Sequence, residues 1–252
     1  MYKVTETENI RPLFDNMQET IVWSCLDKCM GAIYADSLER PKSAMALLGD
    51  FCFFAGEPDY DLVDSRNKVW NQEFLIMVPE NELWAALIEK CYGGHAIRIT
   101  RYAIQKEEHI WDLDKLKQIC HKISKEFELK FIDEEIYNYA KQSDWAADLV
   151  SQFPDYASYR ENGLGVAALK DGILVSGASS YSFYKGGIEI EIDTRKDYRR
   201  RGLAAACGAA LILECEKRGI YPSWDAQNKG SVALAEKLGY HFDREYCAYE
   251  IQ

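Results

Sequence analysis

Three consecutive arginines, Arg199, Arg200 and Arg201, stand directly before Gly202 in a chain whose formal net charge is −11. The glycine opens a stretch of small apolar residues that is typical of a buried helix. N–H groups at a helix start have no intrahelical partner and carry partial positive charge, so a basic cluster there favours a bound anion. The spacing Arg-x-x-Gly-x-Ala, ending at Ala204, therefore predicts a pyrophosphate-binding loop, and a solvated basic turn is the alternative.

The residues before this loop alternate between isoleucine and a carboxylate from Ile188 to Asp193. Because strand side chains point to opposite faces in turn, Glu189, Glu191 and Asp193 share one face. A base beside an acyl donor suits acylation of an amine, since an ammonium must lose its proton before it attacks. Glu189 or Glu191 is the predicted base, and a solvated acidic face is the alternative.

The elements that position these groups follow from local signals. Residues 202–218 form one predicted helix, ended by Gly219, and a strand follows near residues 221–226. Asn228 is a good N-cap for a short amphipathic helix that Gly239 ends. Asn228 and Ser231 lie three residues apart near that helix start, where both can face a ligand; ordinary capping is the alternative.

The run from Gly187 to Tyr240 resembles the GCN5-related N-acetyltransferase (GNAT) superfamily. The resemblance rests on the loop signature at 199–204, on the Asn-x-x-Ser helix start at 228–231 and on the phrase LAEKLGY at 234–240. Thr194, Tyr198-Arg199 and the segment 221–226 are more narrowly similar to the zwittermicin A resistance-type subfamily. The resemblance implies a mixed α/β (α+β) fold with a central, mostly antiparallel sheet flanked by helices.

The family likeness also implies a site. Two strands part near residues 192–194, where backbone groups hold the pantetheine arm, and amides of residues 200–204 bind the pyrophosphate. The implied cofactor-binding residues are Ile192, Asp193, Thr194, Arg199, Arg200, Arg201, Gly202, Leu203, Ala204, Asn228 and Ser231. The implied activity is acetyl-CoA-dependent transfer of an acetyl group to a primary amine of a small molecule, such as an amino-containing antibiotic. The alternative is a non-catalytic CoA-binding regulatory protein with the same fold.

One position departs from the family pattern. Many members carry a tyrosine seven residues after the asparagine as the acid for the leaving thiolate, and this chain has Ala235 there. Either Tyr221, Tyr240 or Tyr246 replaces it, or the thiolate leaves without a dedicated acid.

Composition sets the remaining expectations. The chain is long for one minimal acyltransferase fold, so we expect an N-terminal α/β half at 1–127 and the acetyl-CoA-binding half at 128–252. The first half reads as strand, strand, strand, helix, strand, ending in a helix at 112–127, and suggests a degenerate copy without the basic loop. Histidine and cysteine spacings predict no metal site, the acidic balance argues against nucleic acid, and the polar N-terminus predicts a cytoplasmic protein without membrane contact.

Overall fold

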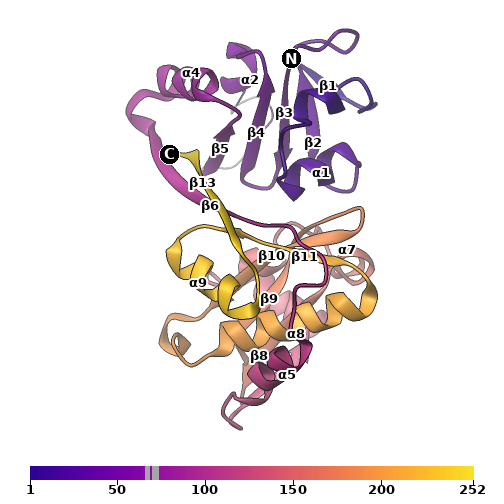
Figure 1. The fold of residues 1–252 in the computed structure, drawn as a ribbon, viewed down its shortest axis with the longest axis vertical. Coiled ribbons are helices and arrows are strands. Elements are labelled where there is room, and N and C mark those ends of the chain that lie inside the picture. Colours follow the sequence, from indigo (N-terminus) through magenta and orange to yellow (C-terminus); the bar gives the residue numbers. More distant parts are fainter. Residues whose placement is uncertain (66–68, 70–73) are drawn as a thin grey trace. The chain divides into compact units, whose positions relative to one another are not determined.

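The computed structural model describes residues 1–65, 69 and 74–252 (Figure 1). The chain divides into two compact units, residues 1–101 with 245–252, and residues 102–244. The division therefore differs from the one expected between residues 127 and 128. Helix α5 (Leu113–His121) belongs to the second unit because it packs on α8 (Leu203–Arg218), with the Cys120 thiol 3.7 Å from the Ala206 carbonyl oxygen.

The first unit is built on an eight-stranded sheet with the strand order β1-β2-β3-β4-β5-β13-β6-β12, whose last strand pairs with the end of β6 that belongs to the second unit. Strands β6 and β13 each continue from one unit into the other. The core of this unit includes a stacked pair, Phe54 and Trp84, with ring centroids 4.9 Å apart. Its strands are β1 (Tyr2–Val4), β2 (Ala32–Ala35), β3 (Ser43–Leu48), β4 (Phe51–Gly56), β5 (Leu75–Pro79), β6 (Ala96–Ile104) and β13 (Phe242–Ile251). Its helical segments are η1 (Arg11–Phe14), α1 (Thr20–Leu26), α2 (Tyr60–Val63), α4 (Glu82–Tyr92) and η2 (Gly93–His95).

The second unit has a sheet in the order β11-β10-β9-β8-β7, with α8 packed along its central strands (Figure 1). The small residues of α8 allow this close approach, and the helix contributes to the buried core. The strands are β7 (Phe127–Phe131), β8 (Gly165–Lys170), β9 (Ile173–Tyr184), β10 (Gly187–Thr194), β11 (Tyr221–Ser223) and β12 (Asp225–Ala226). The other helical segments are α6 (Glu134–Lys141), η3 (Ala147–Leu149), α7 (Tyr156–Asn162), η4 (Lys196–Tyr198) and α9 (Lys229–Leu238).

The two sheets repeat one topology. In the first unit β1, β2, β3 and β4 are antiparallel neighbours in turn, and β5 is parallel to β4. In the second unit β7, β8, β9 and β10 are antiparallel neighbours in turn, and β11 is parallel to β10. In each unit a helix, α4 or α9, follows the parallel strand. The mixed α+β architecture predicted from the sequence is confirmed.

Two predicted elements are wrong in their extent. The helix predicted at 112–127 ends at His121, and Phe127 begins β7. The strand predicted at 221–226 is interrupted at Trp224, because β11 pairs with β10 whereas β12 pairs with β6. Both helices that follow the basic loop begin and end close to their predicted bounds. Across the described residues, the helices are all too short or too polar to span a bilayer.

Candidate active site

Strands β10 and β11 pair over only three residues and then part. The parallel register joins Gly187 to Tyr221 and Glu189 to Ser223, and β11 ends there while β10 continues to Thr194. The next residues of the chain turn away to pair with β6. Residues 190–194 of β10 therefore pair with β9 on one side but not with β11 on the other. We call this edge without a β11 partner the opening, and it contains the predicted segment 192–194.

Glu189 lies at the point where the strands part and is 7% exposed. It is directly opposite Ser182 on β9 and Ser223 on β11. The charge of this carboxylate helps to raise the pKa of Tyr221 to about 12, after burial as the main cause. The predicted base at this position is therefore a buried group rather than part of a solvated face.

Glu191 lies in the open part of β10 and is partly buried. Its carboxylate oxygen Oε1 accepts the backbone N–H of Ile192 at 3.2 Å. This amide belongs to the segment whose N–H groups were predicted to contact the donor. The two candidate bases therefore differ in burial and in their hydrogen-bond partners, although they lie on the same strand.

Asp193 has an unusual acidity that the sequence did not indicate. Burial and the charge of Asp148 raise the pKa of Asp193 to about 6, against an opposing effect of Arg199. Asp148 comes from η3, where Leu149 packs over Gly177, the β9 residue paired with Asp193. A carboxylate that is destabilised in its ionised form beside an opening is typical of a functional site. The run DWAADL at 144–149 gave no local signal of this contact.

The basic loop has a backbone suited to anion binding. Arg200 has φ 65° and Gly202 has φ 82°, so two left-handed residues alternate with ordinary ones. Such alternation points successive N–H groups toward one side and forms an anion-binding concavity. The first backbone bond of α8 joins the Ala206 N–H to the Gly202 carbonyl at 3.0 Å. The amides of residues 203–205 therefore precede the helical ladder.

The arginines around the loop have distinct contacts. The Arg199 guanidinium donates from Nε to the Thr194 carbonyl at 3.1 Å and ties the loop to the end of β10. Arg195 forms a bidentate pair with Asp197, and the guanidinium groups of Arg195 and Arg201 lie 4.6 and 4.9 Å from the ring centroid of Tyr198. The side chains of Arg199, Arg200 and Arg201 are exposed. This leaves a solvent-facing cationic surface at the helix start.

Asn228 and Ser231 have clear structural roles. The Asn228 side chain caps α9 by accepting the Ser231 N–H at 3.0 Å, as the capping alternative expected. The Ser231 hydroxyl accepts the indole N–H of Trp224, also at 3.0 Å. Their predicted contact with the CoA arm stays a prediction.

Two of the tyrosines offered as general acids are held by backbone groups. The buried Tyr240 hydroxyl donates to the Pro222 carbonyl at 2.6 Å, and burial raises the pKa of Tyr240 far above its usual range. The Tyr221 hydroxyl donates to the Gln105 carbonyl at 3.3 Å and accepts the Glu107 N–H. Tyr246 belongs to the first unit, where its hydroxyl accepts Nε–H of Arg101. Ala235 is fully buried in the core, so a phenol would not fit there without repacking.

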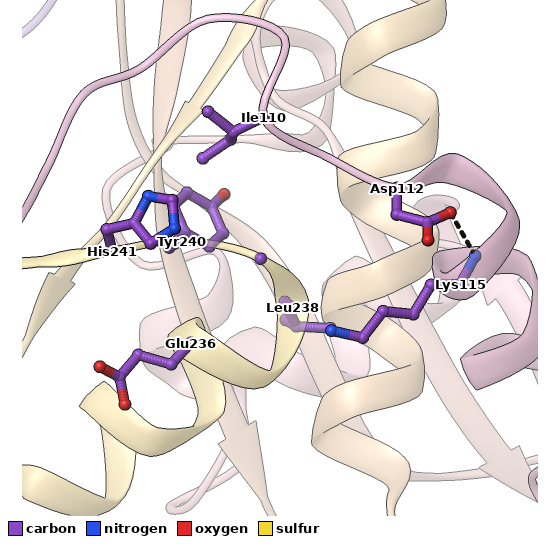
Figure 2. A pocket seen from close by; sticks show the side chains of 8 residues that line it. Ile110, Asp112, Lys115, Glu236, Leu238, Tyr240 and His241 are labelled. Atoms are coloured by element: carbon purple, nitrogen blue, oxygen red, sulfur yellow. Dashed lines mark hydrogen bonds between the residues drawn. The ribbon is translucent and has the colours of Figure 1, made fainter.

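A separate pocket of about 420 Å³ lies between the start of α5 and the end of α9 (Figure 2). Asp112 and Lys115 line it from α5, and Glu236 and Leu238 line it from α9. None of the predicted donor-binding residues lines it. This pocket is therefore a different place from the strand opening with its carboxylates and basic loop.

Comparisons with known proteins agree with this arrangement. The GNAT acetyltransferase family matches residues 11–249 of the chain. The chain is 26% identical to the uncharacterized N-acetyltransferase YdfB of Bacillus subtilis (strain 168), over 96% of this chain and 94% of that protein. It is 44% identical to a GCN5-related N-acetyltransferase-like protein from Streptococcus suis 89/1591, over 98% of each chain, with a TM-score of 0.93. A GCN5-related N-acetyltransferase from Kribbella flavida shares the fold at 16% identity and a TM-score of 0.55, over 83% of this chain and 86% of that one.

Proposed function

The chain belongs to the GNAT acetyltransferase family and is an N-acetyltransferase, and on that premise we propose that it transfers acetyl directly from acetyl-CoA to a primary amine of a small molecule. One observation carries the proposal: the opening between β10 and β11 lies on the same strand that leads into the left-handed basic loop and α8. Carboxylates, a donor edge and an anion-binding loop thus follow one another within residues 189–204.

The basic loop holds the donor. The amides of residues 200–204 take the pyrophosphate, aided by the charge of Arg199, Arg200 and Arg201 and by the dipole of α8. Gly202 has open space within 4 Å of the position a Cβ would take, so the pyrophosphate can approach its backbone. The backbone of residues 192–194 pairs with the pantetheine arm along the edge that β11 leaves open.

The transfer step forms one bond and breaks another. The neutral amine nitrogen attacks the thioester carbonyl carbon, the C–S bond breaks, and CoA leaves as a thiolate. The proton lost by the amine goes to Glu189 or Glu191. The Ile192 N–H polarises the carbonyl, so the donor replaces the Glu191 carboxylate that holds this amide in the free protein.

The thiolate leaves without a tyrosine dedicated to its protonation. This follows from the commitment of Tyr221 and Tyr240 to backbone carbonyls and from the buried Ala235. A thiol with a pKa of about 8.5 is a good leaving group near neutral pH, so a dedicated acid is not required.

The acceptor is a cationic small molecule. The chain carries a net charge of −11, and Asp148 lies close enough to Asp193 to raise the pKa of that carboxyl. Negative charge beside the opening attracts an ammonium and favours its approach to the base. An amino-containing antibiotic of the kind suggested by the zwittermicin A resistance-type resemblance fits this description.

The test is release of free thiol from acetyl-CoA in the presence of a panel of amines, including polyamines, amino acids and aminoglycoside-like antibiotics. Acetylation of at least one cationic amine, with mass spectrometry placing the acetyl group on nitrogen, is the expected result. Tight binding of CoA with no turnover on any amine would instead identify a CoA-binding regulatory protein.

A further inference from the structure

A row of three buried polar side chains crosses the sheet where β10 and β11 part. Ser182 on β9, Glu189 on β10 and Ser223 on β11 occupy directly opposed positions. Their exposed fractions are 0%, 7% and 1%, in the same order. Opposed residues on neighbouring antiparallel strands have Cβ atoms about 4.5–5.5 Å apart, so one bridging water can join the Ser182 hydroxyl to the Glu189 carboxylate. Ser223 lies opposite Glu189 on its other side, on the parallel strand β11.

The two serine hydroxyls are the unusual part of this row. Within the part of the chain that the structure describes, neither Ser182 Oγ nor Ser223 Oγ has a hydrogen-bond partner, so neither hydroxyl is bonded directly to the Glu189 carboxylate. Buried hydroxyls are normally paired, because leaving one unpaired forfeits its hydration without return. Two such groups on either side of a buried carboxylate point to that carboxylate as their common acceptor.

The other candidate base has a different neighbour. Glu191 is opposite Ser179 on β9, and the Ser179 hydroxyl is bonded to the Tyr159 hydroxyl at 2.7 Å. On the side of β10 away from β9, Glu191 has no opposed residue on β11, because the pairing of the two strands ends at Ser223. Uncommitted hydroxyls therefore surround Glu189 and not Glu191.

We propose that Ser182 and Ser223 are positioning residues that donate hydrogen bonds through bridging waters to the Glu189 carboxylate, keep it ionised, and aim it at the opening where the amine loses its proton. This assignment rests on the proposed acetyl transfer and selects Glu189 over Glu191 as its base. Hydrogen bonds to the charged form lower the pKa of a carboxyl, and they offset the burial that would otherwise neutralise Glu189.

The ionisable groups near Glu189 do not obscure the titration of its carboxyl. Burial, with a smaller contribution from the charge of Glu189, raises the pKa values of Tyr184, Tyr221 and Tyr240, so these hydroxyls stay protonated through neutral pH. On its own strand Glu191 and Asp193 also carry charge, and Asp148 faces Asp193 from η3. Substitution of Ser182 or Ser223 changes none of these groups.

The experiment is a ¹³C NMR titration of the Glu189 carboxyl in the full chain, assigned with Glu189→Gln. In the Ser182→Ala, Ser223→Ala double variant we expect the pKa of Glu189 to rise by about one unit, because two donors to the charged form are lost. The acid limb of the kcat profile should move up with it, while the Kd for acetyl-CoA stays unchanged. An unaltered Glu189 titration in the folded double variant overturns the assignment.

Ser179→Ala is the matched control. It removes a hydroxyl from the same strand that is already bonded to Tyr159, so it should lower the unfolding temperature without moving the Glu189 titration. Removing the two hydroxyls that stabilise the ionised carboxylate should also lower the unfolding temperature at neutral pH, so the Glu189 titration, and not the stability, separates the double variant from the control. If the wild-type protein acetylates no amine, the acetyl-transfer proposal fails by itself, and the titration still decides whether the serines act on Glu189.

Discussion

In each unit the fourth strand of the antiparallel series is followed by a different kind of segment on the way to its parallel neighbour. In the second unit β10 carries three carboxylates and is followed by the arginine-rich loop. In the first unit β4 has the apolar sequence FCFFAG and is followed by Glu57, Pro58 and Asp59. The same topology therefore presents a cationic loop in one unit and an acidic segment in the other.

In the first unit, side chains form hydrogen bonds to the backbone at the end of β4, where its parallel pairing with β5 stops. The Gly56 N–H donates to the Glu80 carboxylate at 2.8 Å, and the Gly56 carbonyl accepts the Trp84 indole N–H at 2.9 Å. In the second unit the Ile192 N–H on β10 donates to the carboxylate of the adjacent Glu191. A ligand can displace the Glu191 side chain, whereas Trp84 is fully buried and fixed.

This comparison suggests that the two units, which share one topology, have different roles. We propose that the first unit is a degenerate copy that has lost the donor site, because acidic residues replace the arginines and a buried tryptophan fills the strand end. The second unit kept polar side chains in its sheet, and burial of these side chains lowers its free energy of unfolding.

The largest effect is expected from Gly202→Val. A β-branched residue at φ 82° is strained, and its side chain projects into open space where the pyrophosphate approaches the backbone. Calorimetric titration with CoA should change from one equivalent bound per chain to no measurable binding.

Gly219→Val is the matched control, because Gly219 caps the other end of α8 at φ 66° and also has open space around its Cβ position. It should cause a similar loss of stability and leave CoA binding intact. One equivalent still bound with unchanged affinity by folded Gly202→Val would mean that the basic loop does not hold the donor.

The next largest effect is expected from removing the base. Glu189→Gln keeps the shape of the side chain and should lower kcat by roughly two to four orders of magnitude, the usual range for loss of a general base. Glu191→Gln should have the smaller effect of the two, and both variants should bind CoA. Steady-state thiol release from pH 6 to 9 measures this, and full activity of both variants would place the base elsewhere.

Much of the donor loop and its helices could be predicted from the sequence, because their signals are local. Gly202 and Gly219 mark the ends of α8 through left-handed backbone, and Asn228 caps α9 through its own side chain. These features depend on residues within one turn of each other. A single sequence shows them directly.

The unit boundary and the acidity of Asp193 could not be predicted in this way. The C-terminal strand pairs Tyr249 with Met77, and β12 pairs Ala226 with Tyr102, so distant segments decide where each unit ends. The raised pKa of Asp193 depends on Asp148, which reaches it from another element. Such contacts leave no periodicity or spacing in the chain.

Asp193→Asn should stabilise the protein above pH 6. The pKa of Asp193 is raised to about 6, above its unfolded value of 3.8, so its favourable contribution is complete below pH 3.8 and is lost as the pH rises through 6. The gain of the variant at pH 7.5 should be at most about 3 kcal/mol, reduced by solvent screening, and should vanish below pH 4. Urea unfolding at both pH values measures it; an equal difference at the two values would contradict a titrating origin.

The smallest expected effect tests the first unit. Trp84→Phe keeps an aromatic ring against Phe54 but removes the indole N–H that bonds the Gly56 carbonyl. Loss of this buried bond and of some volume should reduce stability by about 1–3 kcal/mol. Because the first unit is assigned no donor site, the Kd for CoA should stay within twofold of wild type. Thermal unfolding and calorimetric titration of the same samples give both values.

Trp224→Phe makes the same chemical change in the second unit. Trp224 is also buried, but its indole N–H bonds the Ser231 hydroxyl, which is a predicted contact of the CoA arm. A similar loss of stability should therefore come with several-fold weaker CoA binding, because Ser231 is no longer held in place. The contrast between the units fails if Trp84→Phe weakens CoA binding as much as Trp224→Phe, since the closed strand end would then contribute to the donor site.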